Sequence, residues 1–283
     1  MTTTETTRSG ETGHLTTGWD ADLDLDDTLL RRYVFALAAS NVAPVAAMGG
    51  RVLRRDEVIA ADRGIPNAVF NAAVLTQPPG QGRPPDEGAF EATLATVEDH
   101  YTGGTGRVYL WSPWPTPDLR HRGWVLDGHP PLLVRPPEAP LPPDHEALEI
   151  REVHDRRSLD DFTVCSWRAS RSTSYNPSNL ACGSMNACST WPTTGCSSDT
   201  WTARRSFSGW LLLHGPLGVL VLAATLPEAR RRGYWAAMLR RRLHAAEERA
   251  VATIFGDMSR PGAQRYGFLP LFRFTLWHRD RRP

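Results

Sequence analysis

Hydrophobic and polar positions change their period most clearly in the last third of the chain. An apolar run without charges extends from Gly218 to Leu226 and stops at Pro227, which is typical of a buried β-strand. After Gly233, apolar residues recur at three- and four-residue spacing as far as about Glu248, which indicates a helix with one apolar face. The apolar positions of this predicted helix are Trp235, Met238, Leu239, Leu243 and Ala246.

The turn between this strand and this helix combines basic residues with a glycine. Arg230, Arg231 and Arg232 directly precede Gly233. The first N–H groups of a helix have no intrahelical acceptors, and the helix dipole favours an anion beside them. Glycine has no Cβ, so the oxygens of an anion can approach its backbone closely. The turn therefore predicts a phosphate site, although an ordinary connection with a solvated basic edge fits the same residues.

The same periodicities predict a first domain over residues 21–134. Its elements alternate between amphipathic helices and short apolar strands, separated by glycine- and proline-containing turns. They are a helix around residues 25–37, strands over 51–61 and 68–76, a helix over 90–101, a strand over 108–112 and a further strand within 124–134.

Two polar stretches mark the ends of this domain. Residues 1–20 are polar and rich in threonine, which predicts a disordered tail. Residues 135–146, RPPEAPLPPDHE, contain five prolines and no hydrophobic period, which predicts a semi-rigid linker. A second domain is then expected over residues 147–283.

Composition and charge argue against two classes of partner, nucleic acids and membranes. The net charge is +1, so the chain as a whole should not be attracted to nucleic acid or to an anionic membrane. No apolar run approaches the roughly 18 residues that a membrane helix needs, and the N-terminus has no apolar signal core. We therefore expect no nucleic-acid partner, no membrane and a cytoplasmic location.

Residues 165–210 depart from the rest of the sequence. They hold all four cysteines and four of the ten tryptophans of the chain. The cysteines, Cys165, Cys182, Cys188 and Cys196, form no C-x-x-C pair and have no histidine among them, so we expect no metal site. A disordered Ser/Thr-rich loop is one interpretation, but tryptophans are uncommon in such loops.

A second interpretation of residues 165–210 is translation out of frame. All 32 basic residues of the chain are arginines, which indicates a GC-rich coding sequence. With such codons, a one-base shift can restore an apolar and acidic pattern typical of a helix followed by two strands. The frame would return near Leu211. Under this hypothesis the chain has lost the helix and the central strands of its second domain.

The predicted turn also resembles a known motif. Arg230-x-x-Gly233 after an apolar strand is similar to the pyrophosphate-binding motif of the GNAT superfamily of acyl-CoA N-acyltransferases. The resemblance covers about residues 146–283; the later elements that match in order are a strand over 251–255, a Gly-Phe pair at 267–268 and a final strand over 272–278. It implies an α/β fold of two GNAT-like domains, each a mixed sheet flanked by helices. The first is degenerate, because residues 21–134 contain no Arg-x-x-Gly after a strand.

The resemblance also implies a co-substrate and a reaction. Acetyl-CoA would donate its acyl group to a small-molecule or peptide amine, without a metal. Its pantetheine arm would face the backbone of Ala223, Ala224 and Thr225, and its phosphates the backbone of Arg231, Arg232, Gly233, Tyr234, Trp235 and Ala236. Attack of a neutral amine on the thioester needs a proton acceptor, an oxyanion donor and an acid for the thiolate.

This sequence departs from the family pattern at two positions. Trp235 stands where the motif has glycine or alanine, so its indole either blocks the phosphates or turns outward. Ala263 stands where the family often has its tyrosine acid. Tyr266 is our candidate for that acid, and a packed structural tyrosine is the alternative. Both departures leave open a CoA-binding protein without catalysis, and the arginines of the helix leave open a nucleic-acid binder.

Overall fold

The computed structural model describes residues 28–65, 70–78, 87–141, 150–153, 155, 157–158, 161–162, 165, 196–200, 207–256 and 259–281. The tail predicted over residues 1–20 lies outside them. In chain order the helices and strands are α1 (Leu29–Ala47), β1 (Arg51–Arg54), β2 (Val58–Asp62), β3 (Asn71–Leu75), α2 (Glu87–His100), β4 (Gly106–Ser112), β5 (Val125–Gly128), β6 (Pro131–Arg135), β7 (Arg151–Glu152), β8 (Cys196–Thr200), β9 (Phe207–His214), β10 (Leu217–Thr225), α4 (Tyr234–Ala245), β11 (Ala250–Ile254), α5 (Arg260–Arg265), β12 (Leu269–Arg273) and β13 (Thr275–Arg281).

The described strands form two sheets. A six-stranded sheet has the order β1-β2-β3-β4-β13-β5, and a seven-stranded sheet has the order β12-β6-β11-β10-β9-β8-β7. Each contains one parallel pair, β3 with β4 in the first and β10 with β11 in the second. The other pairs are antiparallel, so the predicted mixed α/β architecture is confirmed.

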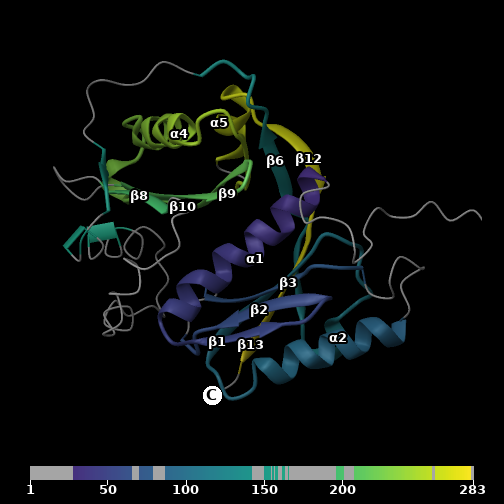
Figure 1. The fold of residues 1–283 in the computed structure, drawn as a ribbon. Coiled ribbons are helices and arrows are strands. Elements are labelled where there is room, and N and C mark those ends of the chain that lie inside the picture. The colour runs from purple at the N-terminus through teal and green to yellow at the C-terminus, as the bar shows by residue number, and fades with distance from the viewer. Residues whose placement is uncertain are drawn as a thin grey trace, which may run out of the picture.

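Helices and sheets alternate in layers (Figure 1). The apolar face of α2, including Phe90 and Leu94, packs on one face of the first sheet. Helix α1 lies between the two sheets, and its Tyr33 and Val34 belong to one core cluster with residues of β3, β6 and β10. Helices α4 and α5 cover the opposite face of the second sheet, with Leu239 in that core. Burying apolar surface on both sides of α1 joins the sheets into one layered body.

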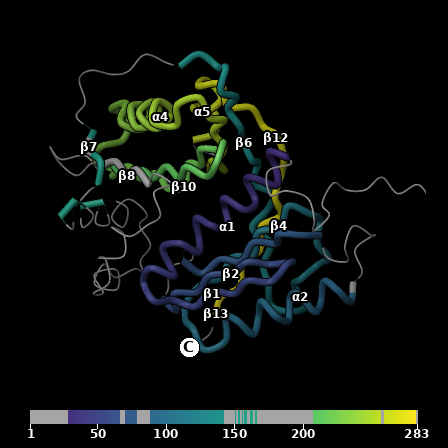
Figure 2. The backbone as a smooth tube through the Cα atoms, in the orientation of Figure 1, coloured from purple at the N-terminus to yellow at the C-terminus, as the bar shows by residue number. Residues whose placement is uncertain are grey.

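Two strands are exchanged between the halves of the chain. β6 precedes the predicted linker, yet it lies between β12 and β11 in the second sheet. β13 is the last described strand, yet it lies between β4 and β5 in the first sheet, and Figure 2 shows the chain running from β12 into β13. Division of the chain into domains at residues 135–146 stays a prediction. β6, from the first half of the chain, belongs to the second sheet, and β13, from the second half, belongs to the first.

Two strand predictions need correction. The single strand predicted over residues 51–61 is wrong, because β1 and β2 form a hairpin there. The polar residues Asp56 and Glu57 occupy its turn, which Arg55 N closes by donating to Val58 O at 3.0 Å. Likewise, the stretch 124–134 holds two strands, β5 and β6, which belong to different sheets.

The compositionally unusual segment 165–210 contributes β8 and the first four residues of β9 to the second sheet. β8 pairs with β7 and β9, and the buried strand β9 pairs with β10. The expected loss of the central strands is therefore wrong, because the backbone of this sequence completes the sheet. Residues 166–195 and 201–206 lie outside the described residues, and translation out of frame stays a hypothesis about the DNA.

Candidate functional site

The parallel strands β10 and β11 pair only over their first three residues. Their pairing runs from Leu217 with Ala250 to Val219 with Ala252 and ends there within the described residues. The next carbonyl of β10, that of Leu220, accepts a hydrogen bond of 2.7 Å from the buried hydroxyl of Thr253. The remaining residues of β10 keep β9 as a partner on one side. Their other edge has no ladder partner in β11 as far as the structure describes the chain, and we call this unpaired stretch between the two strands the wedge.

A bulge and a buried arginine accompany this separation. The register between β10 and β9 shifts between Leu220 and Ala223. Arg242 of α4, only 1% exposed, donates from Nη1 to the carbonyls of Leu222 and Trp210, both at 3.3 Å. Gly209 leaves room for this guanidinium, since an added Cβ would lie 3.3 Å from Arg242 Cζ. The arginine thus joins the bulged strand to its neighbour from beneath the sheet.

The turn after β10 contains two residues in the left-handed conformation. Arg231 has φ of 61°, which is uncommon for a residue with a side chain, and Gly233 has φ of 81° as the N-cap of α4. Left-handed residues of this kind turn successive N–H groups into a concavity that favours anions. No side chain caps α4, and the arginines at 230–232 are exposed. The N-terminus of α4 therefore presents a basic, accessible surface, as the sequence predicted.

The predicted ligand-binding residues lie on two consecutive segments. Ala223 is exposed, and Ala224 and Thr225 are half-buried at the end of β10. The guanidinium Nε of Arg230 donates to Thr225 O at 3.4 Å, which folds the loop back on the strand. The first turn of α4 follows this loop, with Tyr234, Trp235 and Ala236 half-buried. The structure thus places the end of β10 beside the loop that begins α4.

The indole of Trp235 turns toward α5. It meets the ring of Phe255 with centroids 6.1 Å apart and that of Tyr266 at 6.2 Å, both edge-to-face. A Cβ added to Gly262 of α5 would lie 2.9 Å from Trp235 Cζ3. Of the two orientations left open by the sequence, the indole takes neither a blocking position over the arginines nor a fully exposed one. It fills the space between α4 and α5.

Tyr266 ends α5, and groups from two other elements hold it. Its hydroxyl accepts a hydrogen bond of 3.0 Å from Arg240 Nη1 of α4. Its carbonyl accepts from Nε of Arg135, at the end of β6, also at 3.0 Å. Ala263, where the family motif has its tyrosine, is fully buried in the core, so no hydroxyl stands at that position. The role of Tyr266 as an acid stays a prediction.

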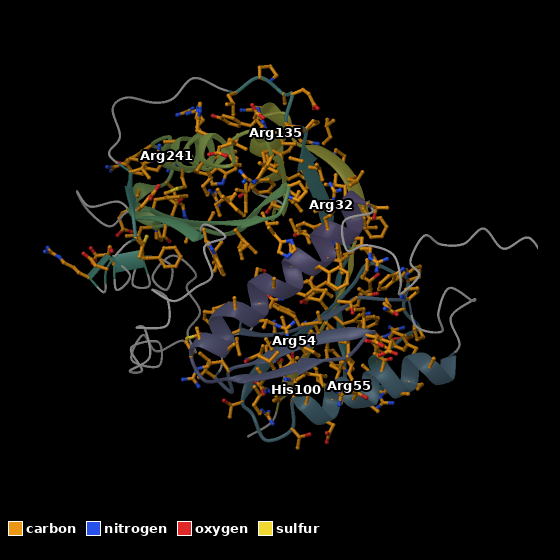
Figure 3. The ribbon with its side chains drawn as sticks, in the orientation of Figure 1. Arg32, Arg54, Arg55, His100, Arg135 and Arg241 are labelled. Atoms are coloured by element: carbon orange, nitrogen blue, oxygen red, sulfur yellow. The ribbon has the colours of Figure 1, made fainter. Side chains whose placement is uncertain are left out.

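Arg135 is buried at the rim of this half of the molecule (Figure 3). Besides Tyr266 O, it donates to the carbonyls of Ala139 and Pro140 at 2.6 and 2.9 Å. Burial lowers the pKa of its guanidinium. The side chain thereby connects β6, the chain after it and the end of α5.

The three arginines of α4, at 240–242, do not share one solvated face. Arg242 is buried beneath the sheet and Arg240 binds the hydroxyl of Tyr266. Arg241 lies 3.7 Å from the carboxylate of Glu152 (Figure 3 labels this arginine on α4). The sequence could not reveal this, because helical periodicity does not show that a bulge leaves a strand carbonyl in need of a donor. Thr253 and Arg242 were both missed for that reason.

Neither a metal centre nor a membrane helix is found in the described part of the chain. No group of three or more histidine, cysteine, aspartate or glutamate side chains lies close enough there to hold a metal ion. None of the helices described is long and apolar enough to cross a membrane.

Comparison with known proteins links this geometry to one fold. No family model matches the sequence, and no curated protein matches it. A GCN5-related N-acetyltransferase from Kribbella flavida aligns with 87% of this chain and 96% of its own, with a TM-score of 0.58 and 13% identity. One from Sphaerobacter thermophilus aligns with 83% of this chain and 76% of its own, with a TM-score of 0.51 and 14% identity.

A third similar structure carries no assigned activity. It is a conserved protein of unknown function from Staphylococcus epidermidis, which aligns with 83% of this chain and 96% of its own, with a TM-score of 0.60 and 11% identity. At these identities the likeness concerns the fold. The chain has the fold of the GCN5-related N-acetyltransferases.

Proposed function

We propose that this chain, which has the fold of the GCN5-related N-acetyltransferases, is an acyl-CoA-dependent N-acyltransferase that transfers acetyl from acetyl-CoA to a primary amine. The observation that carries the proposal is the continuity of two surfaces. The edge of β10 that β11 leaves unpaired leads directly into a loop with left-handed Arg231 and Gly233. The N-terminus of α4 that follows has no side-chain cap. An extended ligand arm that ends in phosphates would meet these two surfaces in the same order, the strand edge and then the helix N-terminus.

The residues present suit such a ligand in chemistry as well as in order. Backbone N–H and C=O groups at Ala223 to Thr225 would bind the amides of the pantetheine arm, as an added strand binds a sheet edge. The exposed Arg231 and Arg232, with the first turn of α4, would hold the phosphates. Acetyl-CoA supplies the activated acyl group, and the protein orients it beside the end of β10.

Tyr266 is the residue that we propose as the acid. Its hydroxyl keeps a proton to donate while its oxygen accepts from Arg240. This hydrogen bond holds the phenol oxygen in a fixed position at the end of α5. The amine would be a small molecule or the amine of a peptide.

A second function is favoured by one observation. The indole of Trp235 fills the space between α4 and α5, and Ala263 supplies no hydroxyl from the core. Both fit a protein that binds CoA without transferring its acyl group. Binding and turnover must therefore be measured separately.

The test has two steps. Titration calorimetry with acetyl-CoA on the full chain should give saturable binding, and absence of binding by the folded protein would contradict both functions. A panel of primary amines, including peptides, is then added with acetyl-CoA while free thiol is detected. Release of thiol that depends on an amine supports the transferase. Tight binding without release by any amine supports the CoA-binding protein.

A further inference from the structure

Trp235 occupies an unusual place relative to the two strands that separate. Its position in the first turn of α4 follows β10 through the loop at 226–233. Its ring contacts lie on the other side of the wedge: Phe255 directly follows β11, and Gly262 and Tyr266 belong to α5 and its end. On its own side Trp235 packs against the cluster that contains Phe207 of β9 and Met238 of α4. The indole therefore connects the β10–α4 side to the β11–α5 side.

The indole packs against Gly262 and two aromatic rings, a site that we call its seat. Gly262 lies against its six-membered part, since an added Cβ would come within 2.9 Å of Cζ3 and 3.0 Å of Cη2. Phe255 and Tyr266 meet it edge-to-face, with interplanar angles of 63° and 75°. Trp235 is also half-buried and packs against the core beneath α4. These contacts hold α5 against α4 at the level of the first helical turn.

We propose that Trp235 and Gly262 form a gate on the acyl-CoA site, an inference that rests on the proposed function. In this proposal the arm passes from the loop before α4 to the edge of β10 that β11 leaves unpaired, between the two sides that the indole connects. The arm binds fully when the indole leaves its seat on Gly262. The arginines at 230–232 lie outside the seat and are exposed, so the phosphate end of the ligand does not depend on the gate.

The gate predicts an effect opposite to that of a merely structural tryptophan. Opening breaks two edge-to-face ring contacts, and such contacts are strong enough to weaken ligand binding by roughly tenfold in total. Trp235→Ala removes that cost, so acetyl-CoA should bind about tenfold more tightly even though the protein is less stable. A tryptophan that only supports the helix would give weaker binding when removed.

Gly262→Ala is a second variant that should open the same gate, by a different change. The new methyl group would displace the indole without removing it. Gly262 lies within α5 and has no positive φ, so alanine there also favours the helix and should not prevent folding. Gly256→Ala is the matched control, because a Cβ at Gly256 meets nothing within 4 Å.

The experiment compares two ligands on four proteins by calorimetry. The proteins are the wild type, Trp235→Ala, Gly262→Ala and Gly256→Ala, and the ligands are acetyl-CoA and adenosine 3′,5′-bisphosphate, the phosphate-bearing end alone. We expect the Kd for acetyl-CoA to fall about tenfold in Trp235→Ala and to fall in Gly262→Ala, and to stay at the wild-type value in Gly256→Ala. The Kd for the bisphosphate should be the same in all four.

Each other outcome is decisive. Unchanged or weaker binding of acetyl-CoA by Trp235→Ala overturns the gate and leaves the proposed function intact. An equal change for both ligands also overturns it, because the indole would then act on the phosphate loop. Binding of neither ligand by any of the four folded proteins overturns the proposed function itself.

Discussion

Asp62, at the end of β2, connects two strands of the first sheet that are not neighbours, β2 and β13. Its carboxylate has no exposed surface, and Arg281 of β13 donates to both of its oxygens at 3.0 Å. Arg51 adds a contact of 2.6 Å, and the N–H of Gly64 one of 2.8 Å. The side chain of Arg281 is itself only 8% exposed. The exchanged strand is therefore held by a buried ion pair.

Asp62→Ala should destabilise the protein strongly. It leaves the guanidinium of Arg281 buried without its carboxylate, and loss of one partner of a buried pair costs about 3–5 kcal/mol. The neighbouring residue on β13 offers a matched control. Asp280 pairs with Arg107 at 2.9 Å, but these side chains are 64% and 42% exposed. Arg107→Ala should therefore cost less than about 1 kcal/mol.

Urea denaturation, followed by circular dichroism and by tryptophan fluorescence, measures the two losses. Trp277 of β13 and Trp124 lie in the core of the first sheet, so fluorescence includes this region. Similar losses of unfolding free energy for Asp62→Ala and Arg107→Ala would refute the reasoning. So would a loss below about 1 kcal/mol for Asp62→Ala, because that is the range of an exposed pair.

The same pair predicts how stability depends on pH. Burial alone would raise the pKa of Asp62, but hydrogen bonds from Arg51, from Gly64 N and from Arg281, together with the charge of Arg281, outweigh it and lower the pKa. A carboxyl group with a lowered pKa in the folded state stabilises the protein above its unfolded pKa of about 3.9. That contribution disappears as the pH falls through the folded-state pKa. The difference between wild type and Asp62→Ala should be full at pH 7 and shrink below about pH 4.

Three further predictions concern the candidate site. Gly233→Ala and Gly215→Ala both place a side chain at positive φ, 81° and 53°, and each should cost about 1–2 kcal/mol in urea denaturation, but only Gly233→Ala should weaken acetyl-CoA binding in calorimetry. Tyr266→Phe should slow thiol release about 100-fold or more while leaving the Kd for acetyl-CoA unchanged; unaltered turnover would exclude the acid role. Arg242→Met should lower the unfolding free energy by about 1–3 kcal/mol and weaken acetyl-CoA binding, because two strand carbonyls lose their donor; Arg242→Lys should recover part of both, and no recovery would argue against positioning by charge.

Local patterns in the sequence were sufficient to predict the strand and helix of the site. An uncharged apolar run ending at a proline became β10, and an apolar stripe at helical spacing became α4. Gly233 adopts a positive φ, where glycine is favoured, so a turn at this position could be predicted from the residue type alone. These features depend on residues close together in the chain.

Features that depend on distant residues could not be predicted in the same way. The sequence predicted a strand within 124–134 and, through the family resemblance, a final strand over 272–278. The second expectation is wrong in its bounds, because residues 272–278 hold the end of β12 and the start of β13, which belong to different sheets. The burial of Arg242 depends on a bulge in another strand, and the position of the Trp235 indole depends on a glycine in α5. A tryptophan at the N-terminus of a helix has the same local sequence whether it turns to the ligand or to a neighbouring helix.

The exchange of β6 and β13 decides how the candidate site is supported. β11, one side of the wedge, has β6 as its other neighbour, with Ile254 opposite Leu132 and Val251 opposite Arg135. Arg135 also holds the end of α5 through the carbonyl of Tyr266. Residues 147–283 alone would therefore leave β11 and β12 without the strand that lies between them, and α5 without this donor. The wedge beside β10 is thus built by both halves of the chain, so the first half contributes to the site although it carries no phosphate motif of its own.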